Sequence, residues 1–153
     1  MTGVQTCALP IYRFKAAVAQ RGCYNFTSFY GTSDIGPWFG DYILGGPVYE
    51  REALFRACSP ITYAHNITTP LRLIHSENDL RCPMEQAEQL FVALKRLGRT
   101  VRFPDEDHDL SRTGRPRHRL ARFRIILEWF ARYVPPGGSG DPDRPDAVRD
   151  ARP

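Results

Sequence analysis

The architecture follows from residues 71–79, which read Leu-Arg-Leu-Ile-His-Ser-Glu-Asn-Asp. The apolar run at the start of this stretch predicts a short buried strand that leads to an acid. Residues 84–97 then carry apolar side chains at helical spacing, with Gly98 as a stop signal. Residues 100–103 predict a second strand, which runs into an acidic loop that contains His108. The pattern is strand, helix, strand, with an acid after the first strand and a histidine after the second.

The rest of the chain alternates in the same way. Residues 14–19 predict another short buried strand, and residues 22–37 predict a loop because they are rich in Gly, Asn, Ser and Asp. Residues 50–57 predict a helix. Residues 116–133 predict a last helix whose apolar stripe we expect to pack on the core, and this stripe consists of Leu120, Phe123, Leu127 and Phe130. Strands separated by helices predict an α/β fold, a parallel sheet flanked by helices on both faces.

Composition is typical of a folded, soluble domain, with 42% hydrophobic and 25% charged residues among 153. No apolar stretch approaches the roughly 20 residues that span a bilayer, so no membrane helix is predicted. We interpret residues 1–11 as a non-native segment resembling a translated sequencing adapter, and residues 12–134 as the folded part. Residues 135–153 are rich in Pro and Gly, which predicts a disordered tail.

The cysteines indicate the redox setting. Cys7 lies in the adapter-like segment, which leaves Cys23, Cys58 and Cys82. An odd number without paired spacing favours reduced thiols in a cytoplasmic protein over a disulfide framework or a zinc site. We interpret Cys82 as a small packing residue, because a reactive thiol needs a lowered pKa and the sequence itself gives no sign of one.

Asp79 and His108 are the candidate catalytic residues. In the α/β-hydrolase order Ser, Asp, His, the acid follows one strand and the histidine follows a later one. A serine hydroxyl attacks well only when a histidine takes its proton, and a carboxylate holds that histidine in the right tautomer. The sequence contains no Gly-x-Ser-x-Gly. We therefore expect a partial α/β-hydrolase fold without the upstream strands and nucleophile elbow, and a chain that is inactive alone.

Four motifs in a fixed order carry a family resemblance: residues 28–36, 59–64, 79–91 and 116–119. On them, residues 13–134 resemble the C-terminal part of the catalytic domain of the prolyl oligopeptidase family of serine peptidases, close to its acylaminoacyl-peptidase and dipeptidyl-peptidase-like members. The resemblance implies that Asp79 is the catalytic acid and His108 the general base. It also implies hydrolysis of short peptides through an acyl-enzyme, without metal or organic cofactor. Membrane and nucleic acid are not expected partners, and homo-oligomerisation of the full-length parent stays open.

The chain departs from the family pattern in three places. Ser76 and Asp107 stand where family members commonly have glycine, and the strand before His108 is a few residues short. A carboxylate beside the general base can raise the pKa of that base. A shift of the His108 loop by about 1 Å can already cost roughly a hundredfold in rate.

Each assignment has an alternative. Asp79 could be a turn or helix-cap residue and His108 a solvated loop residue, and the acids around His108 could form a weak cation site. The chain could then be a non-catalytic interaction module whose sheet edge is completed by another chain.

The aromatic stretch could line a substrate pocket or pack in the core, and it comprises Tyr24, Phe26, Phe29, Tyr30, Trp38, Phe39 and Tyr42. An arginine-rich stretch could bind nucleic acid, although a solvated helix face is favoured, and it comprises Arg112, Arg115, Arg117, Arg119, Arg122 and Arg124.

Overall fold

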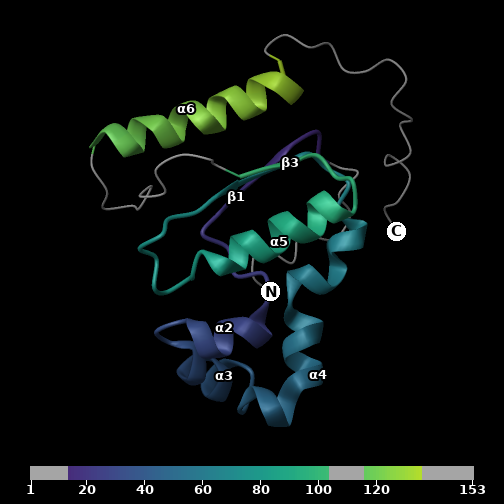
Figure 1. The fold of residues 1–153 in the computed structure, drawn as a ribbon, viewed down its shortest axis with the longest axis vertical. Coiled ribbons are helices and arrows are strands. Elements are labelled where there is room, and N and C mark those ends of the chain that lie inside the picture. The colour runs from purple at the N-terminus through teal and green to yellow at the C-terminus, as the bar shows by residue number, and fades with distance from the viewer. Residues whose placement is uncertain (1–13, 104–115, 136–153) are drawn as a thin grey trace, which may run out of the picture.

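The computed structural model describes residues 14–103 and 116–135, and Figure 1 shows how their helices and strands are arranged. The strands are parallel and lie in the order β1-β2-β3. In chain order the elements are β1 (Ala17–Gln20), α2 (Phe26–Thr32), α3 (Gly36–Ile43), α4 (Val48–Cys58), the 3-10 helix η2 (Pro60–Asn66), β2 (Leu71–Ile74), α5 (Glu85–Arg96), β3 (Val101–Arg102) and α6 (Pro116–Tyr133). The predicted α/β fold is confirmed, and the predicted strands and the helices around α4, α5 and α6 are present with shifts of a few residues at their ends.

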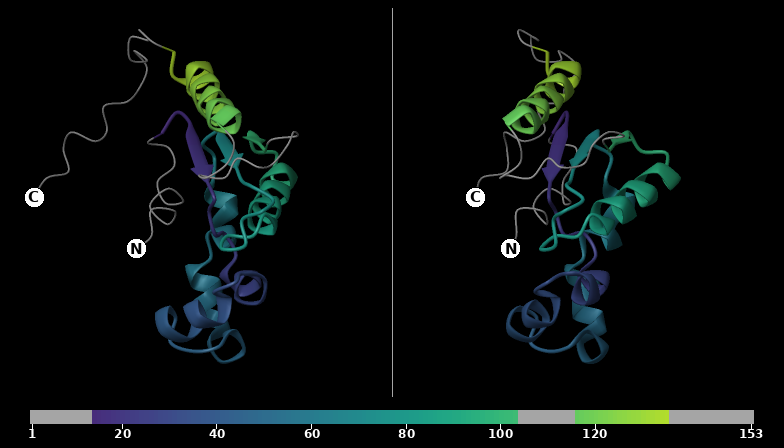
Figure 2. Two further views of the ribbon diagram at one scale, coloured as in Figure 1. Left: turned by 90° about the vertical axis from the view of Figure 1, so that its left-hand side faces the viewer. Right: turned by 60° about the vertical axis from the view of Figure 1, so that its left-hand side comes forward.

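The sheet is covered by one helix on each face, with α5 on one side and α6 on the other (Figures 1 and 2). Successive residues of a strand point to opposite faces, so alternate side chains of β2 contact α5 and α6. Leu71 and Leu73 join the buried cluster that includes Leu90 and Leu94 of α5. Between them, Arg72 lines a small space together with Trp129 and other residues of α6. The short sheet is therefore sandwiched, as expected for parallel strands.

A second core lies in a helical lobe formed by α2, α3 and α4, at the opposite end of the molecule from α6 (Figure 1). Its buried residues are Phe26, Phe29 and Phe55. The Phe39 ring stacks on Phe26 at 5.4 Å and meets Phe29 edge-on at 5.4 Å. The lobe thus packs mainly through aromatic rings, whose edge-to-face and offset contacts are favourable.

The prediction of a loop over residues 22–37 is wrong, because this segment contains α2 and the start of α3. Asn25 caps α2: its side-chain oxygen accepts hydrogen bonds from the backbone N–H groups of Thr27 and Ser28. This cap satisfies donors that the first helical turn leaves unpaired, and burial of two phenylalanines adds a hydrophobic gain. The polar composition of this segment predicts a loop, although its residues form a capped helix with one buried face.

The bounds of α6 match the prediction, but the expected packed stripe is wrong. Those four residues are exposed, with relative accessibilities of 60%, 56%, 67% and 37% for Leu120, Phe123, Leu127 and Phe130. The helix instead buries His118 and Trp129. Its sequence carries two apolar faces, and a narrow three-stranded sheet can cover only one of them. The face with the bulky Trp129 is the one that contacts the strands.

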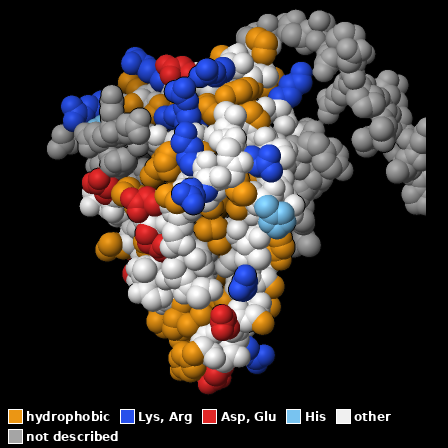
Figure 3. Space-filling view, turned by 45° about the vertical axis from the view of Figure 1, so that its right-hand side comes forward, with side chains coloured by type: hydrophobic (Ala, Val, Ile, Leu, Met, Phe, Trp, Pro, Cys, Tyr) orange, Lys and Arg blue, Asp and Glu red, His pale blue; other side chains and the backbone are white. Residues whose placement is uncertain are grey.

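Figure 3 shows how side chains are distributed on one face of the molecule. Hydrophobic side chains gather at the tip of the helical lobe (Figure 3). The exposed large hydrophobic residues of α3 and α4 include Trp38, Tyr42, Ile43 and Tyr49. Lys and Arg side chains gather toward the end that carries α6 (Figure 3). In the part of the chain that the structure describes, no helix has the length and apolar character needed to cross a membrane.

Candidate active-site edge

The candidate site lies at the carboxyl edge of the sheet. The three strands end at Gln20, Ile74 and Arg102, and because they are parallel these ends meet at one edge. Asp79 follows β2 at this edge, as the sequence predicted. The segment after β3 leads to His108, which lies outside the described residues. The pairing of Asp79 with His108 therefore stays a prediction.

The Asp79 carboxylate is held by the turn that it begins. Its Oδ1 atom accepts hydrogen bonds from the backbone N–H groups of Arg81 at 3.1 Å and Cys82 at 2.9 Å. Its own N–H donates to the carbonyl oxygen of Ser76 at 3.3 Å. Within residues 14–103 and 116–135, no hydrogen bond to Asp79 Oδ2 is formed. The turn therefore uses Oδ1 of this carboxylate, and both of its hydrogen bonds are to backbone N–H groups.

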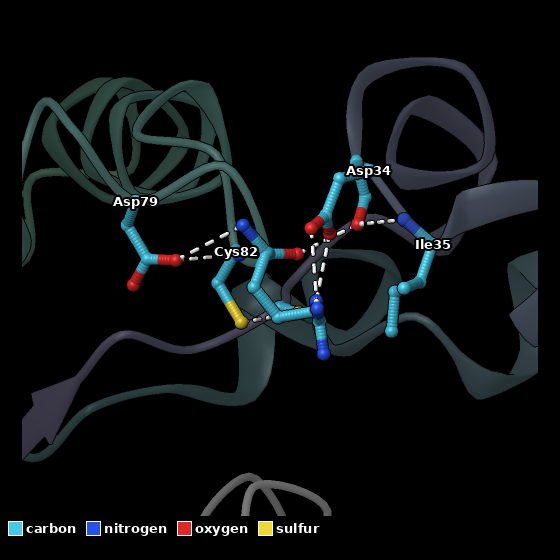
Figure 4. Close-up of polar contacts among 7 residues, drawn as sticks. Asp34, Ile35, Asp79 and Cys82 are labelled. Carbon is cyan, nitrogen blue, oxygen red and sulfur yellow. Dashed lines mark hydrogen bonds and ion pairs between the residues drawn. The ribbon is translucent and has the colours of Figure 1, made fainter.

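The Asp79 turn is clamped to the loop between α2 and α3. Asp34 accepts two hydrogen bonds from the Arg81 guanidinium, at 2.7 Å and 3.1 Å, and its N–H donates to the Leu80 carbonyl at 3.0 Å. Ser33 Oγ donates to the Arg81 carbonyl at 2.7 Å. Figure 4 shows Asp79 on one side of the turn and Asp34 on the other. The Arg81 guanidinium also holds the pKa of the Asp34 carboxyl below its ordinary value.

The buried His75 ring contacts the same turn. It is 1% exposed, and its Nε2 atom hydrogen-bonds the backbone carbonyl of Cys82. Within the described residues, His75 Nδ1 and the neighbouring Ser76 Oγ are buried without a hydrogen-bond partner. Burial lowers the pKa of the His75 imidazole, which keeps the ring neutral near neutral pH. The structure thus gives His75 a supporting role in the Asp79 turn.

His75 should make the fold sensitive to acid. Because the folded-state pKa of His75 is lowered, the unfolded chain binds a proton first, and stability should fall as pH drops below about 6.5, the ordinary histidine value. We expect His75→Gln, which keeps an N–H donor for Cys82, to reduce this loss. Urea midpoints measured between about pH 7.5 and pH 5 test it. An unchanged pH dependence in the variant would contradict the assignment.

Gln86 is a buried polar residue of α5 that sequence reasoning missed. It is 0% exposed, and its Oε1 atom accepts hydrogen bonds from the backbone N–H groups of Tyr24 at 2.9 Å and Asn25 at 2.8 Å. Its Nε2 atom donates to Ser28 Oγ at 2.9 Å. Gln86 thereby ties α5 to the segment that enters α2. The available signal was a polar residue four positions before Leu90, on the core face of the helix.

The aromatic stretch divides between core and surface. Tyr24, Phe26 and Phe29 are buried, as the core interpretation predicted. Tyr24 belongs to the cluster under the sheet, whereas Tyr30 and Phe39 pack against the cluster that contains Phe26 and Phe29. Trp38 and Tyr42 differ, since they are 53% and 74% exposed with ring centroids 5.6 Å apart. These two rings are the ones that remain available to a ligand or partner.

Over residues 14–103 and 116–135, no group of three or more His, Cys, Asp or Glu is arranged to hold a metal ion. The acids around His108, considered above as a weak cation site, lie outside these residues. So do Arg112 and Arg115 of the arginine-rich stretch, while Arg117, Arg119 and Arg124 are exposed on α6.

Comparison with known proteins identifies relatives over most of the chain. Residues 7–136 match the model of the prolyl oligopeptidase family. An uncharacterized peptidase, YuxL, of Bacillus subtilis is 50% identical over 125 residues, which cover 80% of this chain and 19% of that protein. An acylamino-acid-releasing enzyme of Arabidopsis thaliana is 31% identical over 131 residues, 79% of this chain and 17% of that enzyme.

Solved structures of other proteins also resemble this chain. An acylaminoacyl peptidase of Pyrococcus horikoshii superposes with a TM-score of 0.72 at 37% identity, covering 84% of this chain and 21% of that one. A puromycin-hydrolyzing peptidase of Mycobacterium tuberculosis shares the fold at 20% identity, with a TM-score of 0.67. The chain spans about a fifth of the length of the relatives that it matches. It belongs to the prolyl oligopeptidase family of serine peptidases and matches part of the α/β-hydrolase domain of that family.

Proposed function

We propose that this chain supplies the acid and the general base of a serine peptidase that hydrolyses short peptides through an acyl-enzyme. Asp79 would orient His108, and His108 would activate a serine carried by an upstream Gly-x-Ser-x-Gly. The family membership supports the class of reaction, and the relatives named for release of acylated amino acids suggest a peptide with a blocked N-terminus as substrate.

One observation carries the assignment of Asp79. Its Oδ1 atom is occupied by two backbone N–H groups, while Oδ2 forms no hydrogen bond within the described residues. A triad acid needs this arrangement, because one oxygen fixes the carboxylate and the other accepts the N–H of the histidine ring. Asp79 also lies at the sheet edge toward which β3 directs the chain before His108.

The chemistry proposed for the parent enzyme is acyl transfer. His108 takes the serine proton as the hydroxyl attacks the peptide carbonyl, and then gives that proton to the leaving amine. Water, activated by the same histidine, hydrolyses the acyl-enzyme. Asp79 holds the ring in the required tautomer and stabilises the imidazolium ion during both steps.

A second candidate is a non-catalytic interaction module of the same ancestry. The exposed apolar stripe of α6, with Leu120, Phe123 and Leu127 at 60%, 56% and 67% accessibility, favours it. A contiguous exposed apolar surface commonly marks a contact with another protein or domain. This candidate needs neither Asp79 nor His108, so catalytic measurements distinguish the two.

The proposed function is tested by hydrolysis of a chromogenic N-acyl peptide. The chain is compared with a form extended upstream to include Gly-x-Ser-x-Gly, with His108→Ala of the extended form as control. We expect activity in the extended form alone and its loss in the control, with circular dichroism unchanged. A folded extended form that is inert, or a His108→Ala variant that stays active, would contradict the assignment and favour the interaction module.

A further inference from the structure

Two cysteines from distant parts of the sequence lie side by side next to the Asp79 turn. The thiol of Cys23 donates a hydrogen bond to the sulfur of Cys82, with the two Sγ atoms 3.4 Å apart. Both residues are half-buried, and both are free thiols in this structure. A disulfide joins sulfurs at about 2.05 Å, so the two atoms would need to approach by only about 1.3 Å.

The backbone on each side of this pair is anchored. Cys23 immediately precedes Tyr24, whose N–H donates to Gln86 Oε1 at 2.9 Å. Cys82 donates its N–H to Asp79 Oδ1 at 2.9 Å, and its carbonyl is hydrogen-bonded by the buried His75 ring. Neither thiol therefore depends on a flexible segment for its position. The fold brings the two sulfurs together before any bond forms, which lowers the entropy cost of joining them.

The hydrogen bond makes the two thiols chemically unequal. Donation from Cys23 stabilises a thiolate on Cys82, and this lowers the pKa of the Cys82 thiol. The same hydrogen bond, with burial as a second cause, raises the pKa of the Cys23 thiol. Attack on a disulfide is made by the thiolate, so Cys82 is the thiol that reacts first and Cys23 the one that resolves.

We propose that Cys23 and Cys82 form a reversible disulfide with each other when a low-molecular-weight disulfide, such as oxidised glutathione, oxidises them. The Cys82 thiolate attacks one glutathione sulfur, which forms a mixed disulfide and releases one glutathione thiolate. Cys23 then loses its proton and attacks the Cys82 sulfur, which releases the second glutathione. Two protein thiols lose two electrons and two protons in total, and the oxidant is reduced to two thiols.

The bond would join the loop between β1 and α2 covalently to the Asp79 turn. The N–H of Cys82 is one of the two that hold the Asp79 carboxylate, so the cross-link would restrict the residue that positions it. If Asp79 is the catalytic acid, a point that rests on the proposed function, the redox state of this pair would act directly on the triad. The cross-link itself does not depend on that function.

The test is peptide mapping of the purified chain after exposure to oxidised glutathione, with free thiols blocked by iodoacetamide before digestion. We expect a Cys23–Cys82 linked peptide that disappears after reduction. Cys58→Ser is the matched control and should keep the link. Cys23→Ser should lose it and accumulate glutathione on Cys82, because no resolving thiol remains. Amide exchange of Arg81 and Cys82 should also slow in the oxidised chain.

Two results would overturn the proposal. One is a chain in which Cys23 and Cys82 remain fully alkylated after oxidation, and the other is a link that joins either of them to Cys7 or Cys58 instead. Both are read on the unmodified chain, so they hold even if a variant fails to fold. Neither involves peptidase activity, so failure of the disulfide and failure of the proposed function are separate outcomes.

Discussion

Asp79→Asn in the upstream-extended enzyme should lower kcat by about 10⁴-fold, with little change in KM, because loss of the proposed triad acid would leave the histidine in the wrong tautomer. The structure indicates why the fold should survive this change. The asparagine oxygen can still accept the two backbone hydrogen bonds that Asp79 Oδ1 accepts from Arg81 and Cys82. Its NH₂ group then replaces the second oxygen. This group is a hydrogen-bond donor, so it could not accept the hydrogen bond proposed from the His108 ring.

The measurement is steady-state hydrolysis of the chromogenic peptide across pH, with urea unfolding of both proteins. Asp34→Asn is the matched control, since it weakens the exposed ion pair with Arg81 without altering an atom that would contact His108. An exposed ion pair contributes little to stability because solvent screens it, so we expect the control to lose less than about tenfold in kcat. Equal losses in both variants would mean that Asp79 acts only through the turn.

Gln86→Leu should lower the free energy of unfolding by at least roughly 1–3 kcal/mol, because it leaves the buried N–H group of Tyr24 without an acceptor. It also removes the acceptor of the half-buried Asn25 N–H; Gln86 Oε1 accepts hydrogen bonds from these two N–H groups at 2.9 Å and 2.8 Å. Leucine fits the apolar surroundings of α5 but offers no acceptor. The loss should be visible as a lower urea midpoint at unchanged slope.

Val92→Ala provides the control on the same helix. Val92 is 58% exposed, so its replacement should change the free energy of unfolding by no more than about 0.5 kcal/mol. A Gln86→Leu variant as stable as this control would show that the two N–H groups find other partners, and would contradict the role given to Gln86.

The elements that sequence predicted well are those with a strong period. The strand at residues 71–74 and the helix at residues 85–96 combine apolar spacing with clear stops, among them Gly98 with its positive φ of 68°. The segment 22–37 looks like a loop in the sequence because its glycines and polar residues outnumber its two buried phenylalanines, and the Asn25 cap resembles a turn residue. The packed face of α6 does not follow from its sequence, because the helix has two apolar faces and the contact with the sheet selects between them.

The candidate site shows the same division. The position of Asp79 follows from parallel topology, since strand ends meet at one edge whatever the loops do. The contact between Cys23 and Cys82 joins residues 59 positions apart, and nothing local in either segment encodes it. Gln86 likewise required a view of what α5 faces. Sequence patterns indicate which residues leave a strand, whereas tertiary packing decides which of them meet.

The register of the sheet has a consequence for how the chain folds. Ala17 pairs with Leu71, and the whole helical lobe lies in the sequence between them. Contacts between residues so distant close slowly, because the entropy of a long loop must be lost before the pairing is gained. The aromatic core of α2, α3 and α4 involves shorter separations, and once it is compact it brings the ends of that loop closer together. We expect the lobe to form first and to serve as the template on which β1 and β2 join.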